Sequence, residues 1–275
     1  MISYRAAWVV PIDGSPIRDG WVTVHDGRVV GVGPGAHVGN GRVTDLGRVA
    51  LMPGLVNAHT HLELSHFREQ VPAATSFVSW VRKVIALQRS RSGPKAPEIM
   101  EAIRNAIHEA VRCGTAVVGD ISNTLVTFGA LAASPLAAVV FYELIRFNTT
   151  DPAEVVEQAQ RAIDALPLSV SVRPSLAAHA PYSVAPGVFR ALKANMDPEA
   201  LERCSVHLAE SPEETEFIRA GSGPWRALLE ELGSWDPAWV APGGTPVEYL
   251  DACGFLDEHL LAVHGVQMTG TVVVR

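Results

Sequence analysis

The sequence predicts an α/β protein in which a small antiparallel β unit over residues 1–50, expected to be part of a β-sandwich, precedes a larger unit of parallel strands and helices over residues 51–275. Two patterns along the chain predict it. Residues 1–50 carry short apolar alternations separated by turn residues, which is typical of antiparallel strands. After Leu51, short apolar runs alternate with longer amphipathic stretches, which is typical of strands paired in parallel through crossover helices.

Three Asp-Gly pairs separate the apolar segments of residues 1–50. They lie in VVPIDGSPI, IRDGWVTV and VHDGRVVGVG. An Asp-Gly pair between alternating apolar residues is a strong hairpin signal, because both residues accept the positive φ angles of a tight turn. We therefore expect short antiparallel strands joined by turns.

Six short apolar runs follow in the second part, and the stretches between them have the period of amphipathic helices. The runs are GLVNAH, TAVVGD, AAVVFYE, SVSVRPSLAAHA, CSVHLAE and LLAVHG, and TVVVR at residues 271–275 is a candidate seventh strand. Helices are expected near residues 76–89, 97–113, 153–166, 186–195, 212–232 and 246–257. This alternation predicts parallel pairing of the strands.

Each of the six expected strands ends in a polar side chain. In chain order these residues are His59 with His61, Asp120, Glu143, His179, His207 and His264. In a parallel α/β barrel the carboxyl ends of the strands meet at one mouth, so these side chains should converge there. Residues two apart on a strand project to the same face, so His59 and His61 can hold one ion together. A His-x-His pair alone is more often two ordinary histidines, and the further strand-end histidines favour a metal site.

Composition and charge restrict the classes of partner. The 275 residues include 22 basic and 29 acidic residues, a net charge of −7, and no basic cluster stands out. A nucleic acid or an anionic membrane is therefore not expected as a partner. No apolar run approaches the roughly 20 residues of a membrane helix, and the first residues lack the pattern of a secretion signal. We expect a cytoplasmic protein whose three cysteines are free thiols.

The segments MPGLVNAHTHLELS, AAHAPYS, SVHLAES and AVHG resemble the amidohydrolase superfamily in order and spacing. More narrowly, they resemble its branch of adenosine-type and S-adenosylhomocysteine deaminases and triazine hydrolases. HTHLELSHF followed by SFVSWVRKVI most resembles the aminodeoxyfutalosine deaminases of menaquinone biosynthesis. The resemblance implies a TIM-type (β/α) barrel over residues 51–275 and hydrolytic chemistry at its mouth.

The resemblance also implies that His59, His61 and His207 bind one divalent metal. Zn²⁺ is expected and Fe²⁺ is the alternative, because imidazole suits both and three protein nitrogens leave one position for water. Glu210 is implied as the residue that carries protons to the ring nitrogen and the leaving amine, and His264 as a second catalytic residue. The alternatives are ordinary ones, namely packed histidines and a solvated loop carboxylate.

A small-molecule substrate is the expected partner. The residues expected to line its pocket are His179, Glu143, Arg146, Glu63 and Trp80, and for each of them a structural role stays open. No lysine ends an expected strand, since the only lysines are Lys83, Lys95 and Lys193. A carbamylated bridging lysine is therefore not expected, which favours one metal over two.

The family pattern also contains an aspartate at the end of the eighth strand, and no Asp or Glu follows His264. The sequence therefore predicts a barrel that is incomplete at its C-terminal end, lacking strand eight, with impaired turnover. An unclosed barrel leaves the first strand with an unpaired edge, so association into a homo-oligomer is also expected.

The leading functional hypothesis is a metal-dependent hydrolytic deaminase of an aminated purine nucleoside, such as aminodeoxyfutalosine, adenosine or S-adenosylhomocysteine. Hydrolysis of an amide or of another ring substituent at the same site is the first alternative. A non-catalytic metal-binding barrel is the second.

Overall fold

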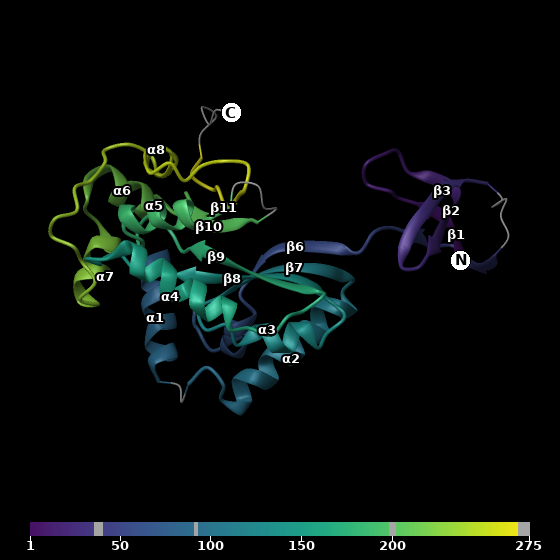
Figure 1. The fold of residues 1–275 in the computed structure, drawn as a ribbon, viewed down its shortest axis with the longest axis horizontal. Helices are drawn as coiled ribbons and strands as arrows, with labels where there is room; N and C mark the ends of the chain where they lie inside the picture. The colour runs from purple at the N-terminus through teal and green to yellow at the C-terminus, as the bar shows by residue number, and fades with distance from the viewer. Residues whose placement is uncertain (36–40, 91–92, 198–201, 269–275) are drawn as a thin grey trace. The chain divides into compact units, whose positions relative to one another are not determined.

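A computed structural model describes residues 1–35, 41–90, 93–197 and 202–268 of the chain. The chain divides into two compact units, Met1–Leu55 and Val56–Arg275 (Figure 1). The predicted strand TVVVR lies outside the described residues. No described helix is long and apolar enough to cross a membrane.

The first unit is a five-stranded sheet. Its strands are β1 (Ile2–Val9), β2 (Ile17–His25), β3 (Arg28–Pro34), β4 (Arg42–Asp45) and β5 (Ala50–Leu51). The pairs β1–β2 and β2–β3 are antiparallel, as expected, but β4 and β5 pair with β1 in parallel. The sheet is therefore mixed and not wholly antiparallel, because β4 and β5 satisfy the edge of β1 that β2 leaves unpaired.

The Asp-Gly pairs of this unit have different roles. Asp26 and Gly27 have φ angles of 49° and 73° and form the two-residue turn between β2 and β3, as their sequence predicts. Gly20, in contrast, lies inside β2 and pairs with β1 and β3, so its Asp-Gly pair makes no hairpin turn. A Cβ atom at Gly20 would lie 2.9 Å from Cγ2 of Val9, so close packing explains this glycine.

The second unit contains six further strands, each overlapping one of the apolar runs identified in the sequence. They are β6 (Leu55–Thr60), β7 (Thr115–Ser122), β8 (Ala137–Leu144), β9 (Val172–Ala178), β10 (Cys204–Leu208) and β11 (Leu260–His264). The sheet orders are β6-β7-β8-β9 and β10-β11, and the pairs β7–β8, β8–β9 and β10–β11 are parallel. The N–H of His207 donates to the carbonyl of His179 at 2.8 Å, which joins β10 to the end of β9. The strands thus follow one another in chain order, as in a (β/α) barrel.

Helices alternate with these strands (Figure 1). They are the 3₁₀ helix η1 (Leu62–Phe67) and the α-helices α1 (Phe77–Arg89), α2 (Pro97–Arg112), α3 (Thr127–Ala132), α4 (Pro152–Asp164), α5 (Pro186–Asn195), α6 (Pro212–Ala220), α7 (Pro224–Glu231) and α8 (Pro246–Ala252). All the predicted helices are present, and η1 and α3 were not predicted. The stretch 212–232 is two helices because Gly221 and Gly223, with φ angles of 65° and 87°, end the first one.

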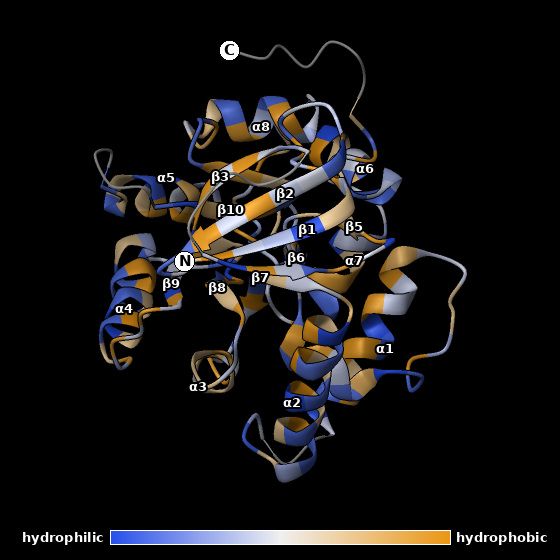
Figure 2. Cartoon of the chain, turned by 90° about the vertical axis from the view of Figure 1, so that its right-hand side faces the viewer, coloured by the Kyte–Doolittle hydropathy of each residue, from blue (hydrophilic) through white to orange (hydrophobic). Residues whose placement is uncertain are grey.

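The helices bury one face against the strands, and bands of apolar and polar residues are visible along α2 and α4 (Figure 2). On α2 the buried residues Ile99, Ile103 and Ile107 recur every four positions, which is the spacing of one helix face. They belong to a core cluster with Val118 of β7. This packing holds the strands whose ends carry the polar residues.

A glycine allows close approach of the first two strands of the second unit. A Cβ atom on Gly119 of β7 would lie 2.3 Å from the carbonyl oxygen of Ala58 in β6, which no larger residue could tolerate. Gly119 therefore sets how closely β6 can pack, and with it the position of His59, the next residue along β6.

A candidate metal centre at the strand ends

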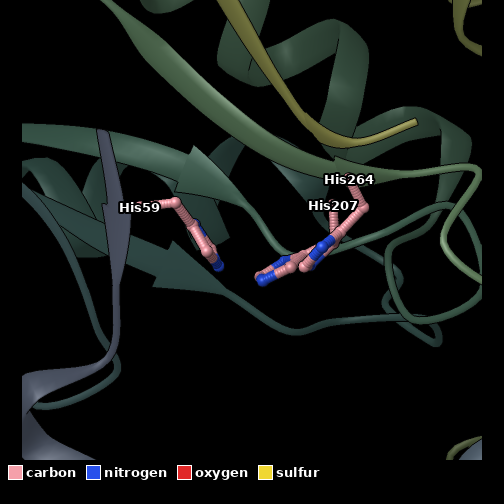
Figure 3. A group of neighbouring side chains, drawn as sticks. All are labelled: His59, His207 and His264. Carbon is pink, nitrogen blue, oxygen red and sulfur yellow. The ribbon is translucent and has the colours of Figure 1, made fainter. Parts of the chain in front are cut away.

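Four histidines from three strands face one another. His59 lies on β6, His207 lies on β10 and His264 ends β11 (Figure 3). His61 directly follows β6. Their ring centroids are 4.8 Å apart for His59 and His207 and 5.3 Å apart for His207 and His264. We call these four residues the imidazole group. Residues separated by up to 205 positions thus converge as the strand-end pattern predicts.

The closest nitrogens in the imidazole group belong to His61 and His207, whose Nε2 atoms are 3.3 Å apart. One ring nitrogen each of His59, His207 and His264 also lies within 4.8 Å of the others. The structure therefore brings together the three predicted ligands, and it places the predicted catalytic residue His264 beside His59 and His207.

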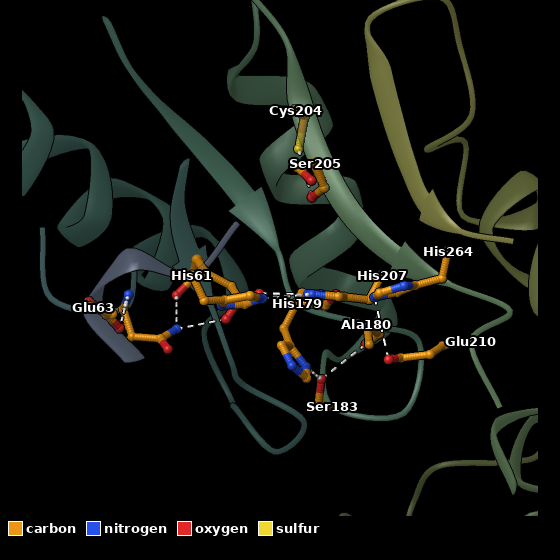
Figure 4. A network of polar contacts seen from close by, with 12 residues as sticks. His61, Glu63, His179, Ala180, Ser183, Cys204, Ser205, His207, Glu210 and His264 are labelled. Carbon is orange, nitrogen blue, oxygen red and sulfur yellow. Dashed lines mark hydrogen bonds and ion pairs between the residues drawn. The ribbon is translucent and has the colours of Figure 1, made fainter. Parts of the chain in front are cut away.

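The orientation of His207 is fixed by its other ring nitrogen. Nδ1 lies 2.8 Å from the carbonyl oxygen of His179 and 3.4 Å from Oε1 of Glu143 (Figure 4). A carbonyl oxygen only accepts hydrogen bonds, so Nδ1 carries the proton and the neutral ring presents the lone pair of Nε2. Metal-binding histidines are commonly oriented in this way, by a hydrogen bond from the nitrogen that does not face the ion.

Burial keeps these imidazoles neutral. It lowers the pKa of His59 to about 4, of His61 to about 2 and of His207 to about 3, and neighbouring histidines add to each effect. Nδ1 of His59 is buried and has no hydrogen-bond partner among the described residues. Neutral rings with free lone pairs are what a cation requires of its ligands.

The geometry suits a tetrahedral ion. Two nitrogens that each lie 2.0–2.1 Å from one tetrahedral zinc ion are separated by roughly 3.3–3.4 Å. The 3.3 Å between the Nε2 atoms of His61 and His207 agrees with that separation. The donor set, the unpartnered nitrogen of His59 and this distance therefore fit a divalent metal.

Glu210 lies beside the imidazole group. It follows β10, and its Oε1 is 3.4 Å from Nε2 of His264. Burial raises the pKa of Glu210 to about 7, although a hydrogen bond from the phenol of Tyr182 acts in the opposite direction. A carboxyl with this pKa can both take and give a proton near neutral pH.

The backbone around Glu210 is held in an uncommon conformation. Ala209 and His264 have φ angles of 52° and 77°, in the left-handed region that residues other than glycine rarely adopt. The N–H groups of Ala209 and Glu210 donate to the buried carboxylate of Glu214 at 2.9 and 2.8 Å. Such strain is found where surrounding structure holds a site in place. Glu214 was not identified from the sequence. Its position three residues after Ser211, the N-cap of α6, could have indicated it.

The carboxylate of Glu63 is satisfied by other parts of the chain. It accepts hydrogen bonds from the hydroxyl of Ser122 at 2.7 Å, the N–H of Asn123 at 2.9 Å and the hydroxyl of Thr124 at 2.8 Å. Glu63 as a whole is only 6% exposed to solvent. These contacts favour the structural alternative for Glu63 over the predicted contact with substrate.

Glu143 is also buried, at 6% exposure, between Asn123 and His207. Burial raises its pKa to about 7, while the neighbouring His207 ring and the hydrogen bond from Asn123 act in the opposite direction. Its contacts with protein groups favour a supporting role. Asn123 was not identified from the sequence, and only its place directly after a strand end could have indicated it.

The other predicted substrate residues lie at different distances from the imidazole group. The His179 ring is 4.9 Å from that of His207, and its Nδ1 is 2.5 Å from the hydroxyl of Ser183. Arg146 follows β8 and is exposed, and its guanidinium has no ion pair among the described residues. Trp80, on α1, is joined to His179 only indirectly, through the ring contacts of Phe77, Trp225 and Tyr182.

The fold and the site together define a (β/α)-barrel protein with a histidine-rich centre at the carboxyl ends of its strands. Residues 50–275 match the model of the amidohydrolase family. The chain therefore belongs to the amidohydrolase family, and both the fold class and the family resemblance that the sequence predicted are confirmed.

The relatives of this chain include two bacterial deaminases. It is 31% identical over 216 residues to adenosine deaminase of Helicobacter pylori, covering 78% of this chain and 50% of that protein. It is 29% identical over 234 residues to aminodeoxyfutalosine deaminase of Deinococcus radiodurans, covering 82% and 54%. The chain thus spans about half the length of the curated relatives it matches.

Solved structures give the same family. Aminofutalosine deaminase of Helicobacter pylori, in complex with methylthio-coformycin, superposes with a TM-score of 0.67 at 26% identity, covering 84% of this chain and 56% of that one. Atrazine chlorohydrolase from Arthrobacter aurescens, complexed with zinc, superposes with a TM-score of 0.74 at 19% identity, covering 96% and 61%. The second likeness shows the fold alone.

Proposed function

We propose that this chain carries the metal centre and the proton-transfer residues of a hydrolytic deaminase that acts on an aminated purine nucleoside. One observation carries the proposal: neutral imidazoles from β6, β10 and β11 converge beside a partly buried carboxyl whose pKa is about 7. Deamination by water requires both an activated water molecule and a group that moves protons to the leaving amine.

His59, His61 and His207 would hold the metal, with zinc favoured and Fe²⁺ as the alternative. Imidazole nitrogens suit both ions, and the separation of the His61 and His207 nitrogens fits the tetrahedral preference of zinc. When bound, the ion supplies Lewis-acid activation of water at neutral pH. One metal is proposed and not two, because no described lysine lies among these residues.

Glu210 and His264 would carry the protons. The Glu210 carboxyl can give its proton to the ring nitrogen of the purine, take up the proton that the attacking water loses and pass that proton to the departing amine, because its pKa lies close to neutral pH. His264 contacts Glu210 through Nε2 at 3.4 Å and can stabilise negative charge as it develops. Both residues face the proposed ligands, so binding and proton transfer would occur at one place.

The relatives named as deaminases of adenosine and aminodeoxyfutalosine support a purine nucleoside as substrate. We place His179, Arg146 and Trp80 in contact with it, as the sequence predicted, and leave Glu63 and Glu143 to support the site. Within this class we favour aminodeoxyfutalosine and thus a step of menaquinone biosynthesis. The predicted cytoplasmic location and homo-oligomeric state remain predictions.

Ammonia release tests the proposal. The purified chain, loaded with zinc, is incubated with aminodeoxyfutalosine, adenosine and S-adenosylhomocysteine, and with a purine amide as a probe of other amidohydrolase chemistry. We expect ammonia from at least one nucleoside and none from the amide. A chain that binds zinc and releases no ammonia from any of the three nucleosides would overturn the deaminase proposal.

A further inference from the structure

A series of polar contacts runs from the segment after His61 to His207. It begins at Glu63, passes through Asn123 and Glu143, and ends at the ring of His207. Glu63 lies in η1 just after β6, Asn123 directly follows β7, and Glu143 and His207 lie on β8 and β10, so the series ties the ends of these four strands to one another. We call Glu63, Ser122, Asn123, Thr124 and Glu143 the carboxylate network.

Asn123 is the member that joins the two carboxylates. Its backbone N–H donates to Oε1 of Glu63 at 2.9 Å, and its side-chain nitrogen donates to Oε2 of Glu143 at 2.8 Å. The same nitrogen lies 3.4 Å from the carbonyl oxygen of Glu143. Since these Glu143 atoms are acceptors, the amide must present its NH₂ group to them.

The second oxygen of Glu143 faces the metal centre. With Oε2 held by Asn123, Oε1 lies 3.4 Å from Nδ1 of His207, and the side chains of His207 and Glu143 are 7% and 3% exposed. Water has little access to this contact, so the direction of the carboxylate depends on the protein groups around it. The Nδ1 proton of His207 therefore lies between Glu143 and the carbonyl of His179.

Glu143, His179 and His207 could be taken for a second cation site, because one ligand atom of each lies within 4.8 Å of the others. The hydrogen bond from Nδ1 of His207 to the His179 carbonyl argues against it. A nitrogen that donates its proton has no lone pair for a second ion. The contact between Glu143 and His207 is thus better explained as orientation of a ligand.

We propose that Asn123 is a positioning residue that, through Glu143, fixes the ring of His207 for metal binding. This inference rests on the proposed function, since it takes His207 as a ligand. Asn123 itself contacts Glu63 and Glu143 and would touch neither the metal nor the substrate. Its loss should leave the chain folded and loosen the hold on the ion, because second-sphere partners of metal ligands typically change affinity by about 10–100-fold.

Zinc affinity of the whole chain tests this inference, measured by competition with a chromogenic chelator. Asn123→Ala removes the side-chain hydrogen bonds to Glu143 and keeps the backbone N–H to Glu63. We expect zinc binding to weaken about 10–100-fold, with a changed absorption spectrum of the cobalt-substituted protein. The metal-free chain should stay folded with a lowered melting temperature, because one hydrogen bond to a buried carboxylate is lost. Asn123→Asp, which keeps the size and replaces the donor by an acceptor, should weaken binding at least as much and provides a second variant.

A double-mutant cycle shows whether Asn123 acts through Glu143. If it does, Asn123→Ala combined with Glu143→Gln should bind zinc no more weakly than Glu143→Gln alone. Additive losses would overturn the inference. Asn148→Ala is the matched control. Asn148 is exposed, like Asn123, and its side chain also donates a hydrogen bond, at 3.0 Å, but to the carbonyl of Trp235, outside the carboxylate network. It should bind zinc like the unaltered chain.

His207→Ala separates failure of this inference from failure of the proposed function. If His207→Ala binds zinc as tightly as the unaltered chain, the proposed metal centre is wrong, and the inference falls with it. If His207→Ala loses zinc while both Asn123 variants keep the original affinity, only the positioning role of Asn123 is wrong.

Discussion

The imidazole group and the carboxylate network lie side by side at the strand ends, yet their polar atoms are used in different ways. In the imidazole group, ring nitrogens face one another, as at the 3.3 Å contact of His61 with His207, and Nδ1 of His59 has no partner among the described residues. In the carboxylate network, Glu63 alone accepts three hydrogen bonds from protein groups. The first set is incomplete without a cation, and the second is complete without one.

This difference indicates which residues act and which support. Buried polar groups in proteins are nearly always hydrogen-bonded, so a buried group without a partner calls for an explanation. A metal explains the histidines, whereas Glu63 and Glu143 need none. Residue type alone could not separate these cases, because histidines and glutamates are both metal-capable residues and both occur at or just after strand ends. Removing members of each set should therefore have different consequences.

The largest effect is expected from His207→Ala. The ring of His207 contacts the rings of His61, His59 and His264, so its loss removes the ligand nitrogen at the centre of the imidazole group. The zinc content, measured by atomic absorption after dialysis, should fall from about one ion per chain to near zero. His108→Ala is the control, because His108 is an exposed residue of α2 and should leave the zinc content as it was.

Glu210→Gln should slow turnover and keep the metal. The amide cannot carry protons, and general acid–base groups contribute about 10²–10⁴-fold to rate. We therefore expect kcat for ammonia release to fall by that factor, with zinc content equal to that of the unaltered chain. Loss of zinc in this variant would instead indicate that Glu210 is a ligand.

Asp120 tests the limit of the comparison, because it is a buried carboxyl whose hydrogen bonds do not offset its burial. Its Oδ1 accepts the N–H of Leu62 at 2.8 Å, yet burial raises its pKa to about 7. A folded-state pKa above the unfolded value means that its contribution to stability is full below about pH 4 and is lost as the pH rises to about 7.

Asp120→Asn should therefore gain stability relative to the unaltered chain across this range. The difference in the free energy of unfolding, from urea titrations of the metal-free proteins at pH 4 and pH 7, is expected to change by a few kcal/mol, on the order of 1.4 kcal/mol per pKa unit. A difference that is the same at both pH values would show that Asp120 is not held protonated by the fold.

The smallest effect is expected from Thr124→Val, which removes one of the three hydrogen bonds to Glu63. Valine keeps the shape and loses the hydroxyl, so the free energy of unfolding should fall by about 1.5–3 kcal/mol, as for a hydrogen bond to a charged group. Zinc affinity should stay within a factor of about two. The variant keeps both contacts of Asn123, with Glu63 and with Glu143, and it is the contact with Glu143 that we expect to orient the metal ligand His207. A loss of zinc affinity well beyond that factor would contradict the division between the imidazole group and the carboxylate network.

Much of the fold could be predicted from the sequence. The alternation of short apolar runs with amphipathic stretches located all six strands of the second unit. The parallel pairing of β4 and β5 with β1 could not be found in this way, because it depends on which strand edge is free. The break between α6 and α7 was not predicted, although the two glycines that cause it, Gly221 and Gly223, stand in the sequence.

For the candidate site, the sequence by itself determined which residues stand at strand ends, and therefore that His59, His61, His207 and His264 would meet. The spacing of two residues and the parallel strand order are enough for that, because both follow from local periodicity. Only the tertiary structure decided that Glu63 is saturated with hydrogen bonds, that Asn123 links it to Glu143, and that His264 lies beside His59 and His207. Those facts depend on contacts between residues that are distant along the chain, and their distances are set by side-chain packing between strands, which no local pattern encodes.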